Sequence, residues 1–202
     1  MRSTNRGYRM AKRGESVAQT RQRIVDAAVT LHGTLGPAAT TIAAIAAEAG
    51  VTRLTVYRHF PDLDSMFAAC SARWMSQQQP PRPDHWTLIH DPVERLAVAL
   101  ADVYRFYRDA QAMLALVVRD AAQIPTAQRN DNAAMNAQMC GVVMAGFRVR
   151  TGPRRRRIEA AVGHVMAFGT WESLCVEQGL DNDDAVDLAV TMVTAVVRER
   201  RR

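Results

Sequence analysis

The stretch Thr40-Thr-Ile-Ala-Ala-Ile-Ala-Ala-Glu-Ala-Gly-Val-Thr-Arg-Leu-Thr-Val-Tyr-Arg-His-Phe60 decides the fold of the N-terminal part of the chain. It predicts two short helices that cross steeply over a tight turn. Ala46 is small enough to let the helices approach closely, and Gly50 has the backbone freedom that the turn requires. Val51 and Val56 are expected to fill the space between the two helices.

The second of these helices has a polar and basic face that the apolar contacts leave free. Its side chains are donors of the kind that bind phosphates and the edges of bases in DNA. An ordinary helical hairpin with a solvated polar face is the alternative, but the combined placement of small, apolar and basic residues favours a helix-turn-helix. The residues of this face are Thr52, Arg53, Thr55, Arg58 and His59.

Apolar residues recur at helical spacing through most of the remaining chain, and no alternating pattern of useful length predicts a strand. Proline and glycine residues separate the periodic segments. The expected fold class is therefore all-α. The predicted helices cover residues 20–35, 41–49, 52–60, 63–76, 92–107, 113–122, 126–149, 154–178 and 182 to the C-terminal arginines.

Three regions are expected along the chain. Residues 1–19 read as a disordered basic arm, because arginines are spread among glycine and serine with little to bury. Residues 20–67 form the helix-turn-helix domain, and residues 68–202 form a second helical domain. The proline-rich segment 77–83 marks the neighbourhood of the junction, because three prolines cannot continue a helix.

Composition limits the classes of function. The 26 basic and 20 acidic residues give a net charge of +6, which favours a polyanionic partner. No secretory signal or membrane-spanning run is visible, and the three dispersed cysteines fit a reducing compartment, so a cytoplasmic location is expected. The five histidines are scattered and no phosphate loop or hydrolase motif occurs, so no enzyme activity, metal or cofactor is expected.

Residues 20–67 resemble the DNA-binding domain of the TetR family of transcriptional regulators. The resemblance rests on Arg21-Gln-Arg-Ile-Val-Asp-Ala-Ala, Thr40-Thr-Ile, Ile45-Ala-Ala-Glu-Ala-Gly-Val and Val56-Tyr-Arg-His-Phe-Pro. It implies an N-terminal three-helix DNA-binding domain and a C-terminal helical domain for ligand binding and dimerisation. The implied function is a sequence-specific regulator, usually a repressor, that a small effector releases from a palindromic DNA operator.

The resemblance also assigns roles to residues. Thr41 is expected to cap its helix and meet a phosphate, while Arg53 is the best candidate for reading a base, because a guanidinium can grip guanine with two hydrogen bonds. Leu54 stands where the family usually has a smaller residue, and the acidic Asp62-Leu63-Asp64 stands where a phosphate-binding lysine is common. The expected DNA-binding residues are Thr41, Thr52, Arg53, Leu54, Thr55, Tyr57, Arg58 and His59.

Two further sites are implied in the C-terminal part. Methionines and aromatic residues are expected to line an apolar effector pocket at Trp74, Tyr104, Tyr107, Met113, Met139, Phe168 and Trp171. Segment 154–178 is apolar on two sides, which suggests that one side meets a partner, although a thick monomer core would also explain it. The expected homodimer interface comprises His164, Ala167, Trp171, Cys175, Val190, Val193 and Val197.

Two other classes of function remain as alternatives. An effector-independent DNA-architectural protein would bind DNA with little sequence preference, but it would not need the long C-terminal part. A thiol redox sensor would need activated cysteines, and Cys70, Cys140 and Cys175 lack basic neighbours in the sequence.

Overall fold

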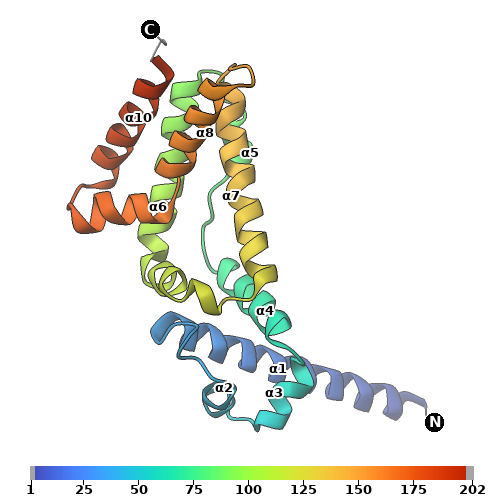
Figure 1. Cartoon of the computed structure of the whole chain (residues 1–202). Helices are drawn as coiled ribbons and strands as arrows, with labels where there is room; N and C mark the ends of the chain where they lie inside the picture. The colour runs from blue at the N-terminus through green and yellow to red at the C-terminus, as the bar shows by residue number, and fades with distance from the viewer. Residues whose placement is uncertain (1–2, 199–202) are drawn as a thin grey trace. The chain divides into compact units, whose positions relative to one another are not determined.

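The computed structural model describes residues 3–198, with the side chains of residue 12 and of residues 14–198. All regular secondary structure in this range is helical, which confirms the all-α prediction (Figure 1). The chain divides into two compact units. The first contains the residues up to Gln77 together with Ala115–Arg129, and the second contains Gln78–Leu114 together with the residues from Asn130 onward.

The first unit is built on four helices around one apolar core. Helix α1 packs against both α2 and α4, and α2 packs against α3. The core between them contains Ile24, Ala28, Ile45, Ala46, Val56, Phe60, Met66 and Cys70. The helices are α1 (Ser3–Thr34), α2 (Ile42–Glu48), α3 (Arg53–His59) and α4 (Leu63–Met75).

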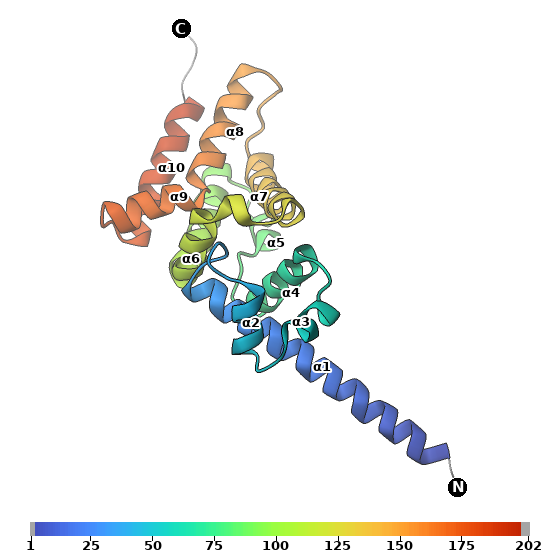
Figure 2. The ribbon, with the colours of Figure 1, turned by 60° about the horizontal axis from the view of Figure 1, so that its bottom comes forward.

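Helix α1 begins at Ser3 rather than near Thr20. The arm of residues 1–19, which was expected to be disordered, is therefore helical from Ser3 onward. Figure 2 shows the N-terminal half of α1 continuing past the helices α2–α4. No proline interrupts this segment, and alanine, methionine, lysine and arginine favour a helix even where they bury little surface. The lack of apolar residues in the arm indicated a lack of packing, and it was wrong to infer a lack of helix from it. The expected boundary after residue 67 also differs from the unit boundary, because all of α4 belongs to the first unit.

The second unit is a bundle in which α8 packs against α10. Its largest fully buried side chains include Trp86, Leu96, Leu100, Tyr104, Ile158 and Trp171. The elements are α5 (Pro83–Trp86), α6 (Pro92–Arg119), α7 (Thr126–Gly146), α8 (Pro153–Val165), α9 (Phe168–Trp171), the π-helical segment η2 (Glu172–Glu177) and α10 (Asn182–Arg198). The last five residues of α6, with the short 3₁₀ segment η1 (Ala121–Gln123) and the start of α7, belong to the first unit.

Helix α6 is continuous from Pro92 to Arg119, where the sequence predicted two helices, 92–107 and 113–122. The predicted gap was wrong because residues 108–112 contain no glycine or proline and nothing else that stops a helix. The same α-helix therefore contributes Tyr104 and Tyr107 to the second unit and ends in the first unit at Arg119.

The predicted helix 154–178 is also wrong as a single element, because the chain leaves helical geometry at Ala167, whose ψ is 143°. The hydroxyl groups of Tyr104 and Tyr107 donate hydrogen bonds of 2.8 Å to the carbonyls of Val165 and Met166, respectively. The hydroxyl of Thr170 donates to the carbonyl of His164. Side chains thus satisfy carbonyls at the end of α8, so the break leaves few backbone groups unpaired.

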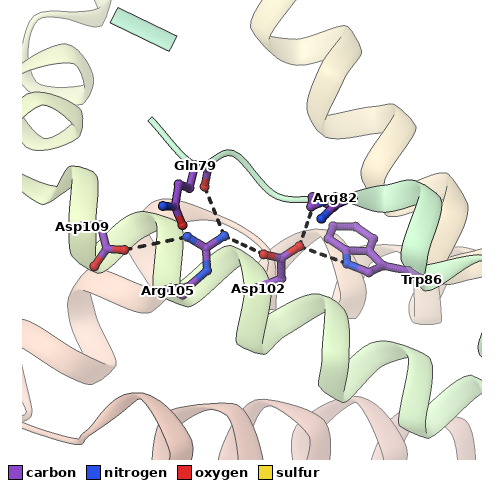
Figure 3. Close-up of polar contacts among 6 residues, drawn as sticks. All are labelled: Gln79, Arg82, Trp86, Asp102, Arg105 and Asp109. Atoms are coloured by element: carbon purple, nitrogen blue, oxygen red, sulfur yellow. Dashed lines mark hydrogen bonds and ion pairs between the residues drawn. The ribbon is translucent and has the colours of Figure 1, made fainter. Parts of the chain in front are cut away.

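A polar network fixes the segment before α6 to that helix (Figure 3). The Asp102 carboxylate accepts hydrogen bonds from the Arg82 backbone N–H at 2.7 Å and from the Trp86 indole N–H at 3.2 Å. It also pairs with Arg105 at 2.7 Å, and Arg105 in turn donates to the carbonyl of Gln79. Because Trp86 is almost fully buried, Asp102 is the partner that its indole N–H requires.

Asp102→Ala is expected to lower the free energy of unfolding by about 1–3 kcal/mol, because it leaves the buried indole N–H of Trp86 without an acceptor. Urea denaturation followed by circular dichroism measures the change. Asp109→Ala is the matched control, since Asp109 lies on the same helix in exposed ion pairs. Its expected change is within about 0.5 kcal/mol. Equal stability of the two variants would contradict the structural role given to Asp102.

None of the helices within residues 3–198 combines the length and the apolar character needed to cross a lipid bilayer.

Candidate nucleic-acid interface

Two threonines and one glycine set the geometry of the predicted helix-turn-helix. Thr41 precedes α2, and its hydroxyl accepts a hydrogen bond of 3.1 Å from the Ala44 N–H. Thr52 caps α3 in the same way through the Thr55 N–H. Between the helices Gly50 has a φ of +64°, a left-handed conformation that residues with a Cβ rarely adopt. The cap predicted at Thr41 and the turn residue predicted at Gly50 are therefore confirmed.

Helix α3 has one buried face and one exposed face. Val56 is fully buried, at 0% exposure, in the core between α1, α2 and α4. On the opposite side Leu54 is 69% exposed and Tyr57 is 53% exposed. A leucine and a tyrosine both left in solvent on a seven-residue helix are unusual for a purely structural element, because their apolar surface gains nothing there.

The predicted DNA-binding residues share this exposed side or its edge. Thr55 and His59 are half-buried at the edge, and the Thr55 hydroxyl lies 2.9 Å from that of Thr52. The structure therefore places the predicted residues on either side of Val56 in the sequence on one accessible surface, which we call the α3 face. Its exposed members are Thr52, Arg53, Leu54, Tyr57 and Arg58, and Thr41 is exposed at the start of α2.

Contacts from α1 hold α2, α3 and α4 in place behind the α3 face. The Arg21 guanidinium lies 4.6 Å from the centre of the Phe60 ring, over its face, as in a cation–π contact. Phe60 itself is 2% exposed and belongs to the apolar core of the first unit. Asp26 on α1 pairs with Arg73 on α4 at 2.7 Å. Helices α1, α2 and α4 thus pack behind α3 and hold the α3 face toward the solvent.

The acidic start of α4 has a local structural explanation. The Asp62 carboxylate accepts a hydrogen bond of 2.7 Å from the Ser65 N–H, so Asp62 is the N-cap of α4. The hydrogen bonds from Ser65, backbone first and side chain second, lower the pKa of Asp62. A carboxylate at a helix N-terminus is also favoured by the helix dipole.

The residues expected to line an effector pocket fall into several environments. Tyr104, Tyr107, Phe168 and Trp171 are buried in one aromatic cluster of the second unit, with the Tyr107 and Phe168 rings 5.4 Å apart and edge to face. Burial raises the pKa of Tyr107 to about 12, so its hydroxyl stays protonated and donates. Met113 is half-buried in the same unit, whereas Trp74 lies on α4 of the first unit.

A small cavity of about 80 Å³ lies between α7 and the end of α8. Of the predicted pocket residues only Met139 lines it. Ligand sites for drug-sized molecules usually measure about 300–1,000 Å³, so this cavity in its present form accommodates only a few atoms. The lining residues are Asn136, Met139, Cys140, Gly163, Met166 and Ala167.

The residues expected at a dimer interface differ in how exposed they are. Trp171 and Val193 are buried within the protomer, and Val190, Val197 and Cys175 are half-buried. His164 and Ala167 are exposed on or just after α8. The sequence analysis did not name Leu188 and Met192, which are 38% and 43% exposed on α10. Their exposure could not be told from the helical period alone, because α10 has apolar residues on more than one side.

The described residues contain no activated cysteine and no cluster of metal-ligating side chains. Burial raises the pKa of Cys70 to about 12 and also raises the pKa values of Cys140 and Cys175. Raised values disfavour the thiolate that redox sensing requires. No group of three or more His, Cys, Asp or Glu side chains with the geometry of a metal site occurs in this part of the chain.

One contact near the start of α2 was not predicted from any sequence pattern. Arg119 and Asp120, at the end of α6, bond to the backbone of the loop between α1 and α2. The residues joined are more than 80 positions apart, and an adjacent arginine and aspartate are too common to predict such a contact.

Comparison with known proteins agrees with this geometry. Residues 24–70 match the family model described as bacterial regulatory proteins, tetR family. No curated protein sequence matches the chain. The match covers α2, α3 and the parts of α1 and α4 that pack against them.

Solved structures share the fold over almost the whole chain. A TetR-like transcriptional regulator from Rhodococcus sp. RHA1 is 19% identical with a TM-score of 0.58, covering 90% of this chain and 97% of that one. NalD, the secondary repressor of the MexAB-OprM multidrug efflux pump in Pseudomonas aeruginosa, is 22% identical with a TM-score of 0.63 and the same coverages, 90% and 97%. A putative fatty acid metabolism regulator from Clostridium perfringens is 14% identical with a TM-score of 0.57, covering 88% and 100%.

The exposed α3 face lies within the segment that matches the tetR-family model, and the fold of the chain is the one seen in TetR-like regulators. Residues 24–70 are therefore similar to the DNA-binding domain of the TetR family.

Proposed function

We propose that the protein is a repressor that binds a palindromic DNA operator as a homodimer through the α3 face and leaves it when a small hydrophobic effector binds. One observation supports this above all: Arg53, Leu54, Tyr57 and Arg58 are exposed together on a short helix whose other side is fixed by buried Val56. A helix presented in this way fits the major groove of B-DNA. A regulator of this kind acts where the chromosome is, so we propose a cytoplasmic location.

The roles on the α3 face follow from the chemistry of each side chain. Arg53 is at the first position of α3 and is proposed to read a guanine, while the exposed side chain of Leu54 suits the methyl group of a thymine. Thr41, Thr52 and Tyr57 carry hydroxyls suited to phosphate oxygens. Arg58 binds a phosphate or a base, and Thr55 and His59 complete the edge of the surface.

The proposed dimer uses the outer faces of α8 and α10. These helices pack against each other and leave a strip of small or apolar side chains in solvent. Two such helix pairs can form a four-helix interface across a two-fold axis. The proposed interface centres on Ala160, Gly163, His164, Ala167, Leu188 and Met192, with Val190, Val197 and Cys175 at its edge; Trp171 and Val193 support it from within the protomer.

The effector is proposed to enter beside the aromatic cluster of the second unit. Tyr104, Tyr107, Phe168 and Trp171 give this site an apolar and aromatic character. Met139 lines the neighbouring small cavity, and Met113 is a further candidate within the same unit. A drug-sized molecule needs several times the present 80 Å³, so its binding requires the cavity to expand. The methionine side chains can rearrange for that at low cost.

An effector-independent DNA-architectural protein is the alternative. It would bind most sequences with similar affinity, because phosphate contacts carry no sequence information. The well-packed second unit favours the regulator, since an architectural protein has no use for a second core of this size.

Arg53→Ala is expected to weaken operator binding by about 1–3 kcal/mol for each half-site, roughly five-fold to 150-fold in Kd per half-site, because a two-bond contact with one base is lost in each. Fluorescence anisotropy at fixed salt, on the operator and on duplexes changed at one position, measures both affinity and base preference. The preference is expected to relax at one position of each half-site. Arg108→Ala, an exposed arginine outside the first unit, is the control and should bind like the parent chain. Equal affinity of the Arg53 variant and the parent chain would refute base reading by Arg53.

A further inference from the structure

The end of α6 holds the loop between α1 and α2 by two hydrogen bonds to its backbone. The Arg119 guanidinium donates to the carbonyl of Leu35 at 2.8 Å, and the Asp120 carboxylate accepts from the N–H of Ala38 at 2.9 Å. Both contacts lie inside the first unit. Loops normally bond to water or to their own side chains, so a loop held by two side chains from a distant helix has a specified position.

Glycine at position 36 makes this close approach possible. Gly36 has a φ of +89°, and a Cβ at this position would collide with the Arg119 guanidinium and the Asp120 carboxylate. Thr40 closes the loop from the other end by donating to the carbonyl of Gly36 at 2.8 Å. The loop and the side chains of Arg119 and Asp120 therefore lie in close contact at Gly36.

The two side chains also hold each other. Arg119 donates to both carboxylate oxygens of Asp120, at 2.8 and 2.9 Å, a two-bond pairing with fixed geometry. The hydrogen bond from Arg119, followed by that from the Ala38 N–H, lowers the pKa of Asp120 to about 2. The Asp120 side chain is 7% exposed, whereas Arg119 is 55% exposed. The carboxylate is thus charged, enclosed and held in one orientation.

The held loop leads directly into the proposed DNA-binding surface. It ends at Thr41, the N-cap of α2, and α2 in turn packs against α3. A shift of the loop would move the Thr41 hydroxyl and α2, and displacements of about 1 Å are enough to spoil contacts that depend on geometry. The α6 helix that ends in this contact also carries Tyr104 and Tyr107.

We propose that Arg119 and Asp120 are positioning residues for operator binding: they clamp the α1–α2 loop and so fix α2 and α3 in the register that the operator requires. This inference rests on the proposed function. The clamp residues act through the loop and do not themselves touch DNA.

The test measures operator affinity of Arg119→Met and Asp120→Ala by fluorescence anisotropy at several salt concentrations. Each variant is expected to raise Kd for the operator about tenfold or more, with the slope of log Kd against log salt unchanged because no phosphate contact is lost. Asp120→Asn keeps an acceptor for the Ala38 N–H and is expected to recover part of the affinity. Arg108→Met is the matched control, since Arg108 forms the same kind of adjacent pair with Asp109 on α6.

A second readout separates positioning from misfolding. Amide hydrogen exchange at Ala38 is expected to accelerate in Asp120→Ala, while exchange in the core helices α1 and α4 stays as in the parent chain. Parent-like affinity in both Arg119→Met and Asp120→Ala would overturn the clamp and leave the proposed function intact. A salt slope reduced by about one in Arg119→Met would overturn positioning in favour of a direct phosphate contact. Failure of the parent chain to select any operator would overturn the proposed function itself.

Discussion

Val56→Asp is expected to lower the free energy of unfolding of the first unit by more than about 4 kcal/mol, the range reached when an unpaired charge is buried. Val56 is fully buried where α3 meets the core, and no basic side chain is among its buried neighbours. Most of the variant chains should therefore lose the structure of α2 and α3 at ambient temperature. Thermal and urea denaturation followed by circular dichroism measures the loss.

Leu54→Asp is the matched control for this prediction. Leu54 lies two residues earlier on α3 and is 69% exposed, so the same aspartate meets water there and stability should change by less than about 0.5 kcal/mol. DNA binding should nevertheless fall, because a negative charge would face the phosphates. Similar losses of stability in both variants would mean that α3 does not have one buried and one exposed face.

Leu188→Glu combined with Met192→Glu is expected to convert a dimer into a monomer and to abolish operator binding at concentrations where the parent chain is saturated. The two residues are exposed apolar side chains one turn apart on α10, and four like charges across a two-fold axis would repel. A monomer holds only one half-site, so the gain from binding both half-sites together is lost, which is commonly a factor of about 10²–10⁴. Sedimentation equilibrium and anisotropy measure the two effects.

The control for the dimer prediction places glutamates at exposed apolar residues on other elements. Leu88 is 74% exposed and Met135 is 54% exposed, and neither lies on α8 or α10. Leu88→Glu with Met135→Glu should leave the oligomeric state as in the parent chain. If the α10 variant stays dimeric, the interface proposed for α8 and α10 is wrong, even if the protein binds DNA.

The sequence was most informative where local chemistry determines structure. Thr41 and Thr52 cap helices because a hydroxyl before a helix can bond to a free N–H, and Gly50 turns because it lacks a Cβ. These effects act within a few residues, so their spacing can be seen in the sequence. The fold class and helices α2, α3 and α4 were predicted for this reason, and the α3 face was predicted with them.

The sequence was least informative where contacts between residues far apart in the chain determine the structure. The end of α8 depends on hydroxyls of Tyr104 and Tyr107, which lie about sixty positions earlier. The clamp on the α1–α2 loop joins Ala38 to Asp120 across 82 positions. Neither contact changes the helical period that the prediction relied on. The same limit applies to the proposed dimer interface, where burial of Val193 and exposure of Met192 depend on how α10 packs against α8.

The central claim is that the α3 face reads DNA sequence. Selection of bound duplexes from a random pool by the parent chain, with Arg53→Ala selected in parallel, tests it most directly. We predict that the parent chain enriches one palindrome of two inverted half-sites, and that the variant enriches the same palindrome with one position of each half-site relaxed. Enrichment of no motif by the parent chain, or of identical motifs by both proteins, would contradict the claim.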